Sequence, residues 1–239
     1  MTTRLSGRTA VVTGASRGIG AAISSALAGE GARVVLLARN ESTLKEAAKR
    51  LKGSIPITCD VSDPKNVERA AKQIRSELGD APDILVNNAG IFGVSVVEET
   101  TADFFVRTID TNLVAPFLFV RAFLGDMKKR KSGHVVTIGS IADRSIFTGN
   151  AAYSAAKFGL RAVHEVLRAE LKESGIRASL ISPAATDTEI WDSVTVTDPV
   201  GKPHSKRPML DPDDVAVAVI FALTQPPKVN IDELRLSHS

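Results

Sequence analysis

The chain has 239 residues, of which 44% are hydrophobic and 24% charged, and its formal net charge is +3. This length and composition fit one α/β domain, and the small charge excess argues against a nucleic-acid-binding stripe or a membrane-binding face. The single cysteine, Cys59, excludes an internal disulfide, and because no apolar run resembles a signal peptide or approaches the ~20 residues of a membrane-spanning helix, we expect a cytoplasmic protein.

Short apolar runs alternate with helical patterns along the whole chain. The apolar runs predict seven strands, at residues 9–13, 33–38, 55–59, 83–87, 134–138, 177–181 and 229–236. The helical patterns between them lie at about 21–27, 41–52, 64–78, 102–127 and 150–171, and after residue 211. The fourth pattern contains Pro116, where we expect a kink or break. Strands interleaved with helices predict one doubly wound parallel sheet with helices on both faces, and no linker divides residues 1–239.

A glycine-rich run follows the first predicted strand. Gly14, Gly18 and Gly20 lie between that strand and a helix, where backbone N–H groups and the helix dipole favour a pyrophosphate. The spacing is GxxxGxG rather than GxGxxG. A tight turn between strand and helix also needs glycine, so this run alone leaves both interpretations open.

The end of the second predicted strand bears on the choice of cofactor. An NAD-preferring site places a carboxylate there for the ribose hydroxyls, whereas this chain has Ala38, Arg39 and Asn40. Arg39 and Arg17 together suit a 2′-phosphate, because a guanidinium binds phosphate well. Two solvated arginines are the alternative; we favour NADP(H).

Tyr153 and Lys157 stand one turn apart on the helix predicted to begin near Asn150. An ammonium beside a phenol favours the phenolate and lowers a pKa that is otherwise about 10. Tyr153 is the only tyrosine in the chain. The spacing therefore predicts a general acid/base pair.

Four motifs together resemble the classical short-chain dehydrogenases/reductases: TGASRGIG at 13–20, NNAG at 87–90, Ser140, and YSAAK at 153–157. The resemblance covers nearly the whole chain, and within the family it is strongest to 3-oxoacyl-(acyl-carrier-protein) reductases and related bacterial ketoreductases. It implies a Rossmann fold and hydride transfer between NADP(H) and a carbonyl or secondary alcohol. It also implies a small-molecule substrate and a homotetramer or homodimer, assembled through the two long helices that carry several phenylalanines.

The resemblance also implies which residues form the site. Tyr153 is the acid/base, Lys157 lowers its pKa and holds the nicotinamide ribose, Ser140 positions the carbonyl, and Asn112 holds a water in the proton relay. The implied cofactor-binding residues are Gly14, Ser16, Arg17, Gly18, Ile19, Gly20, Arg39, Asp60, Val61, Asn88, Ala89, Gly90, Tyr153, Lys157, Pro183, Thr186 and Thr188. Taken singly, Ser140, Asn112 and Asp60 also suit ordinary loop, helix or capping roles. No metal site is predicted.

Three features depart from the family pattern or extend it. Ala184 stands where glycine usually follows Pro183, which puts the path of that loop in doubt. The irregular segment 189–210, with Trp191, is expected to be a substrate lid, and its second half alternatively a surface loop. Basic residues near the entrance would bind an acyl carrier protein; Lys131 fits one such position, but Ser174 stands where the other is usually basic.

Two classes of function remain open. The first is an oxidoreductase whose leading substrate is a 3-oxoacyl thioester or a similar ketone, with a 3-hydroxy acid, amino acid or polyol as the alternative. The second is an NADP(H)-binding sensor without turnover, which would be expected to lack Tyr153 or Lys157. Neither class predicts a nucleic acid or a membrane as partner, because the basic run at 128–131 suits the carboxyl end of a helix.

Overall fold

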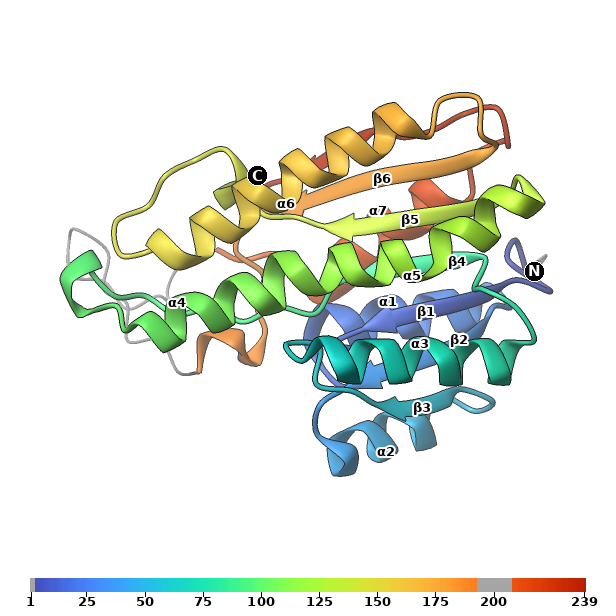
Figure 1. Ribbon diagram of the computed structural model, residues 1–239, viewed down its shortest axis with the longest axis horizontal. Coiled ribbons are helices and arrows are strands. Elements are labelled where there is room, and N and C mark those ends of the chain that lie inside the picture. The colour runs from blue at the N-terminus through green and yellow to red at the C-terminus, as the bar shows by residue number, and fades with distance from the viewer. Residues whose placement is uncertain (1–2, 193–207) are drawn as a thin grey trace.

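The computed structural model describes residues 3–192 and 208–239, and in that part of the chain seven parallel strands form one sheet (Figure 1). The sheet order is β3-β2-β1-β4-β5-β6-β7. The strands are β1 (Thr9–Thr13), β2 (Arg33–Ala38), β3 (Ile55–Thr58), β4 (Ile84–Asn87), β5 (Gly133–Ile138), β6 (Ile176–Pro183) and β7 (Glu233–Leu236). The predicted seven-stranded doubly wound sheet is confirmed. The last strand is shorter than expected, because only 233–236 pair with β6.

Seven α-helices in the described residues connect or cover these strands. They are α1 (Gly18–Gly29), α2 (Glu41–Arg50), α3 (Pro64–Leu78), α4 (Ala102–Ile109), α5 (Ala115–Arg130), α6 (Ala151–Glu170) and α7 (Pro212–Leu223). Two helices begin at side-chain caps: the Asn40 side chain accepts a hydrogen bond from the Thr43 N–H at the start of α2, and Asp63 does the same for Lys65 in α3. Gly79 ends α3 in the left-handed conformation.

The long helical pattern around Pro116 is interrupted. α4 ends at Ile109, a π-helical turn covers Asp110–Val114, and α5 begins at Ala115 with Pro116 in its first turn. Proline has no N–H and its ring clashes with the carbonyl four residues earlier, so the regular helix cannot run through it. The expected break therefore lies in the turn before Pro116.

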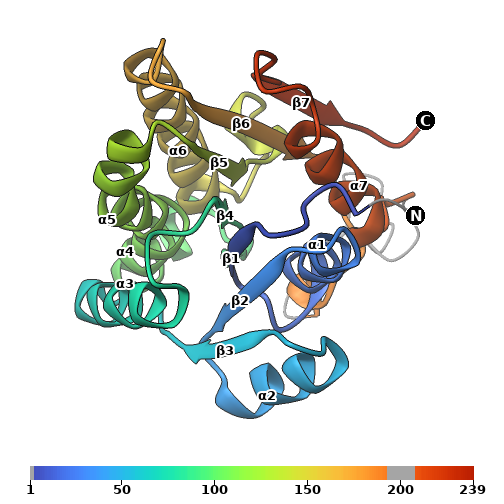
Figure 2. The ribbon, with the colours of Figure 1, turned by 90° about the vertical axis from the view of Figure 1, so that its right-hand side faces the viewer.

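The five inner strands, β2, β1, β4, β5 and β6, bury side chains on both faces. Val12 of β1 and Val86 of β4 face a layer formed by α1, α2 and α7, and Val11 and Leu85 face the opposite layer. Figure 2 shows α1, α2 and α7 on one side of the sheet and α3, α5 and α6 on the other. Burial on both faces explains why the strands are continuous apolar runs rather than alternating ones.

The strand order reverses between β1 and β4. The chain moves outward from β1 through β2 to β3, then returns to pair β4 with the other side of β1. The loops that leave the carboxyl ends of β1 and β4 therefore diverge to opposite faces of the sheet. Such a switch point opens a crevice, which is where ligands bind in doubly wound folds.

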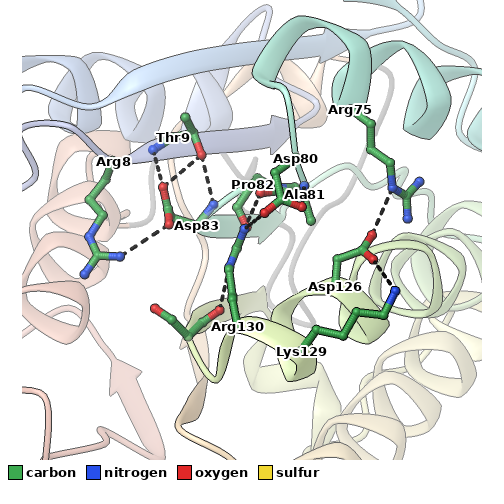
Figure 3. Close-up of polar contacts among 11 residues, drawn as sticks. Arg8, Thr9, Arg75, Asp80, Ala81, Pro82, Asp83, Asp126, Lys129 and Arg130 are labelled. Carbon is green, nitrogen blue, oxygen red and sulfur yellow. Dashed lines mark hydrogen bonds and ion pairs between the residues drawn. The ribbon is translucent and has the colours of Figure 1, made fainter.

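Several basic side chains are used at the opposite, amino-terminal edge of the sheet (Figure 3). The guanidinium of Arg130 donates to the Asp80 carboxylate at 3.1 Å and to the Ala81 carbonyl at 2.7 Å. Lys129 lies 3.4 Å from the carboxylate of Asp126, which Arg75 also contacts. Two members of the basic run at 128–131 thus contact their own chain, which favours the structural interpretation of that run.

Two buried histidines are expected to make the fold acid-sensitive. His134 Nε2 lies 2.8 Å from Ser179 Oγ, and His164 Nδ1 lies 3.0 Å from Thr137 Oγ1. Burial lowers the pKa of His134 to about 3 and that of His164 to about 4. The unfolded chain, with histidine pKa near 6.5, binds more protons below that pH, so stability falls as the pH drops from about 6.5 towards 4.

We expect each histidine to cost about 1–2 kcal/mol of unfolding free energy between pH 6.5 and 5. Urea denaturation across this range, for the wild type and for His134→Asn with His164→Asn, measures the effect. The double variant should lose less unfolding free energy on acidification, because the protonation of carboxylates then causes most of the remaining loss. Equal pH slopes in the two proteins would contradict the assignment.

Candidate active site

A cavity of about 1150 Å³ lies at the carboxyl ends of the strands. It is larger than an ordinary small-ligand pocket of roughly 300–1,000 Å³. Every predicted site residue except Asn112 lines it: Gly14, Ser16, Arg17, Gly18, Ile19, Gly20, Arg39, Asp60, Val61, Asn88, Ala89, Gly90, Ser140, Tyr153, Lys157, Pro183, Thr186 and Thr188. The fold thus brings together residues that are up to 174 positions apart (from Gly14 to Thr188).

The glycine loop allows a close approach of backbone at the start of α1. Gly14 and Gly18 have φ values of +67° and +53°, which side-chain-bearing residues rarely adopt. A Cβ on Gly20 would lie 2.2 Å from the Gly14 carbonyl oxygen. Within the described chain, the Arg17 side chain does not cap α1, so its first N–H groups and the helix dipole point to the cavity. This end of the cavity fits a pyrophosphate.

Thr13 joins the glycine loop to the turn after β4. Its Oγ1 accepts hydrogen bonds from the backbone N–H groups of Asn88 and Ala89, both at 2.9 Å. The Asn88 side chain donates back to the Thr13 carbonyl at 2.8 Å. Two loops that line the cavity from neighbouring strands are therefore fixed to each other across the switch point.

At the end of the cavity that lies beyond β2 and β3, the lining includes charged side chains. Arg17 and Arg39 are exposed on its rim. Asp60, just after β3, accepts hydrogen bonds from the N–H and Oγ of Ser62 at 3.1 and 2.7 Å through one carboxylate oxygen. Both arginines line the cavity, and the residues at the end of β2, Ala38, Arg39 and Asn40, include no carboxylate that would repel a phosphate.

Asn112 fixes the loop that follows β4. It lies in the π-helical turn, is fully buried, and is not among the cavity-lining residues. Its Oδ1 accepts from the Ile91 N–H and its Nδ2 donates to the Ile91 carbonyl, both at 2.8 Å. The expected water of the proton relay stays a prediction.

Tyr153 and Lys157 line the cavity from α6, as expected, but their electrostatics differ from the expectation. Lys157 Nζ donates to the Ile138 carbonyl at 2.9 Å and lies 5.6 Å from the centre of the Tyr153 ring. Burial raises the pKa of Tyr153 to about 12, against a smaller opposing effect of its hydrogen bond with Ser140. Burial lowers the pKa of Lys157 to about 8. The pKa of the Tyr153 phenol is therefore raised in the chain without cofactor, and the prediction that it is lowered is wrong there. Burial removes water from both groups, and the Lys157 ammonium contacts a carbonyl instead of the phenol oxygen.

A buried carboxylate below the site has no counterpart in the sequence prediction. Asp143 is 1% exposed; its oxygens accept from Ser182 Oγ at 2.6 Å and from Arg144 Nε at 2.7 Å. Arg144 also pairs with Glu233 of β7. After burial itself, the Asp143 charge further raises the pKa of Tyr153, and it opposes the effect of burial on the pKa of Lys157. Only its place three residues after Ser140 hinted at this role.

Aromatic side chains form one wall of the cavity. The Phe92 ring lies edge-on to Tyr153, with centroids 4.9 Å apart, and also 4.9 Å from the Trp191 ring. The Trp191 indole N–H donates to the Thr186 carbonyl at 2.9 Å. Phe92 was not predicted as a site residue, because its contact with Tyr153 joins the loop after β4 to α6, 61 residues further along the chain.

The loop after β6 reaches the cavity despite Ala184. Ala184 N–H donates to the Leu236 carbonyl at 2.9 Å, and Ala184 has no positive φ, so the expected disturbance is not observed. Thr186 forms a bridge with Leu210. Of the expected lid at 189–210, the short helix Glu189–Trp191 lines the cavity, and residues 193–207 lie outside the described residues.

Lys131 does not lie at the cavity entrance of its own chain. It ends α5 and precedes β5, so it stands at the amino-terminal edge of the sheet, whereas the cavity opens at the carboxyl end. The whole length of β5 separates the two. The expected position of Lys131 near the entrance is therefore wrong within one subunit.

The described residues contain no group of three histidine, cysteine, aspartate or glutamate side chains that could hold a metal ion. No helix in the same residues is long and apolar enough to cross a membrane.

Comparison with known proteins identifies the family. Residues 8–198 match the family model described as short chain dehydrogenase. The chain is 40% identical over 237 residues to the glycine betaine reductase ATRR of Emericella nidulans, matching 96% of this chain but 18% of that longer protein. It is 36% identical to the uncharacterized oxidoreductase SSP0419 of Staphylococcus saprophyticus, covering 96% of this chain and 97% of that protein.

A solved structure shows the same architecture. The alcohol dehydrogenase from the archaeon Thermococcus sibiricus, complexed with 5-hydroxy-NADP, superimposes with a TM-score of 0.85 at 32% sequence identity. The match covers 96% of this chain and 95% of that one. The seven-stranded sheet is thus common to both proteins.

Proposed function

Since the chain belongs to the short chain dehydrogenase family and is an oxidoreductase acting on CH–OH or C=O groups, we propose that it transfers hydride between NADP(H) and a small carbonyl compound or secondary alcohol. One observation carries this proposal: a phosphate-binding helix terminus and the Tyr153–Lys157 pair line the same cavity. The NADP complex of the Thermococcus sibiricus relative supports the choice of cofactor. The bound nicotinamide would supply or accept the hydride.

The chain's own residues would hold the dinucleotide along the cavity. The uncapped start of α1 takes the pyrophosphate, and Asp60 with Val61 lies beside the adenine. Asn88, Ala89 and Gly90 support the centre, fixed by Thr13. Pro183, Thr186 and Thr188 would line the nicotinamide end; the Thr188 methyl is 3.0 Å from a Cβ built on Gly18, so the loop after β6 packs against the start of α1.

Tyr153 would act as the acid in the reductive direction. A phenol with a pKa of about 12 keeps its proton at neutral pH, so it can protonate a carbonyl oxygen as that oxygen gains charge. Ser140, hydrogen-bonded to this phenol, would position the same oxygen and stabilise its developing charge. Lys157 would hold the nicotinamide ribose.

The preference for NADP(H) over NAD(H) gives a direct test. We expect Arg39→Ala to weaken NADPH binding about tenfold, because it removes a charge-assisted contact to the 2′-phosphate from an exposed site. NADH binding should change less than about twofold, since NADH lacks that phosphate. Arg33→Ala is the matched control: Arg33 is also exposed on β2, but at its amino-terminal end.

Fluorescence titrations of the three proteins with NADPH and NADH provide the measurement. A selective loss of NADPH affinity in Arg39→Ala supports the assignment. An equal loss for both cofactors, or no loss for either, would mean that Arg39 does not read the 2′-phosphate.

The alternative of a sensor without turnover is less well supported. Such a protein has no use for a buried lysine one turn from the only tyrosine, and this chain has both in the cavity. The acyl carrier protein partner also loses support, because Lys131 lies at the far edge of the sheet. That a 3-oxoacyl thioester is the natural substrate therefore stays a prediction, and so does the cytoplasmic location of the protein.

A homodimer or homotetramer is part of the same proposal. Phe105 of α4, Phe117 of α5 and Phe158 of α6 are 39%, 47% and 41% exposed, whereas Phe119 and Phe123 are buried in the chain's own core. Exposed phenylalanines on neighbouring helices suit a helical interface between subunits. Helices α4 and α6 contact one another along one side of the molecule (Figure 1).

A further inference from the structure

We infer that the substrate of the proposed hydride transfer is an uncharged carbonyl compound with an apolar tail, which lies against the loops at residues 94–96 and 146–147. This inference rests on the proposed function and specifies what the same site selects. Three observations carry it: the composition of the cavity wall around Tyr153, the way two loops are joined at its mouth, and a hollow that continues from that mouth.

The wall around Tyr153 is mostly apolar. Beyond the groups already assigned to the dinucleotide, the lining residues on this side are Phe92, Val94, Val96, Ile141, Ala142, Ile146, Phe147, Gly149, Ile190 and Trp191, with Thr148 and Asn150 as the polar members. The other side-chain donors here are Ser140 and Tyr153, which the proposed reaction itself uses. This composition fits a hydrocarbon group better than a polyol, whose hydroxyls would lose water without finding partners.

Charged side chains of the described lining lie elsewhere. Arg17, Arg39 and Asp60 stand at the ends of β1, β2 and β3, on the dinucleotide side. Glu189 faces the glycine loop, with its Oε2 3.6 Å from a Cβ built on Gly18. Lys157 is turned to the Ile138 carbonyl. A substrate carboxylate near the reacting carbon would thus be buried without a free cation among the described residues, which is costly.

The two loops at the mouth are fixed side by side. Ser95 N–H donates to the Gly149 carbonyl at 2.9 Å, and Ser95 forms a bridge with Asn150. Gly149 has φ of +78°, and a Cβ there would lie 2.6 Å from Val94 Cγ1. The left-handed glycine is required for this close packing. The apolar edge of the cavity is therefore built into the backbone.

That edge exposes apolar surface that a ligand tail would cover. Val96 is 39% exposed, Phe147 42% and Ile146 76%. Ile146 and Phe147 also line a second hollow of about 310 Å³, which continues over the first turns of α6 at Ala151 and Ala155. A tail leaving the reacting carbon thus meets a continuous apolar path.

A chain-length series tests the inference. We expect kcat/KM for unbranched methyl ketones, from 2-butanone to 2-nonanone with NADPH, to rise about fourfold per added methylene until the tail leaves the wall. A matched oxo acid, 4-oxopentanoate against 2-pentanone, should be reduced at least about 100-fold less efficiently, because its carboxylate finds no partner cation among the described residues.

Two variants locate the effect. Ile146→Ser should flatten the chain-length dependence, and because Ile146 is 76% exposed the fold should not change. Val97→Ser is the matched control: Val97 is 75% exposed next to Val96 but does not line the cavity, so its series should match the wild type.

The possible results distinguish a failure of this inference from a failure of the proposed hydride transfer. Turnover that is independent of chain length, or that favours the oxo acid, overturns the apolar-tail inference and leaves hydride transfer standing. If Ile146→Ser and Val97→Ser reduce the increase of kcat/KM per methylene equally, the inference is also overturned, because the effect would then not come from the residues that line the cavity. Failure to oxidise NADPH with any carbonyl or thioester contradicts the proposed function itself.

Discussion

Tyr153→Phe should lower kcat for ketone reduction by about 10²–10⁴-fold while leaving NADPH affinity within about twofold of the wild type. The substitution keeps the ring, and with it the edge-on contact with Phe92 at 4.9 Å. It removes only the hydroxyl that would donate the proton. Steady-state kinetics with NADPH and a methyl ketone, beside a fluorescence titration of NADPH, measure both quantities.

Ser154→Ala supplies the matched control on the same helix. Ser154 adjoins Tyr153, is buried, and has no hydrogen-bond partner for its Oγ in the described residues. Removing this hydroxyl should leave turnover unchanged. If Tyr153→Phe retained more than about a tenth of wild-type kcat, the acid role of the phenol would be wrong. If the wild type itself bound NADPH without turnover of any substrate, the sensor interpretation would replace it.

Gly20→Ala should abolish NADPH binding and lower the melting temperature. The new Cβ would lie 2.2 Å from the Gly14 carbonyl oxygen and 2.5 Å from Asn88 Nδ2. Both neighbours are held by other contacts, Asn88 by its hydrogen bond to Thr13, so the glycine loop must move. Overpacking costs about 1–3 kcal/mol, or roughly 2–10 °C in a protein of this size. A displaced loop should also weaken NADPH binding at least about 100-fold.

Gly29→Ala is the matched control, which shows whether the effects on NADPH binding and stability depend on position 20 or follow from any glycine-to-alanine change in α1. Gly29 is the last residue of the same helix, and a Cβ there would have no described atom within 4 Å. This variant should bind NADPH normally and gain about 0.4–1 kcal/mol of stability. Differential scanning calorimetry and NADPH titration compare the two variants. Normal NADPH affinity in Gly20→Ala would contradict the pyrophosphate site at the start of α1.

The architecture was predictable because its signals are local. A strand buried on both faces, such as β1, appears as an unbroken apolar run, and caps such as Asn40 mark helix ends within a few residues. Features that depend on distant partners were missed. The π-helical turn holds Asn112 where it meets Ile91, 21 residues away, and β7 begins only at Glu233 because its pairing with β6 starts there.

The site was predictable to the same extent. Residues within motifs, such as Gly20 and Tyr153, were identified from their spacing, and they line one cavity. Phe92 and Asp143 were not, because their roles arise from contacts with Tyr153 and Ser182 across the fold. The direction of the Tyr153 pKa was missed for a related reason: spacing predicts which groups are neighbours, whereas burial decides how much water they lose.

Deuterium transfer tests hydride transfer most directly. NADPH carrying deuterium on either face of C4 of the nicotinamide is incubated with the protein and 2-octanone, and the alcohol product is analysed by mass spectrometry. The proposed function predicts one deuterium on the carbinol carbon from one of the two labelled cofactors and none from the other, since a single bound geometry presents one face. Alcohol formed without deuterium from either cofactor, or no alcohol from 2-octanone or an acetoacetyl thioester while NADPH binds, would contradict it.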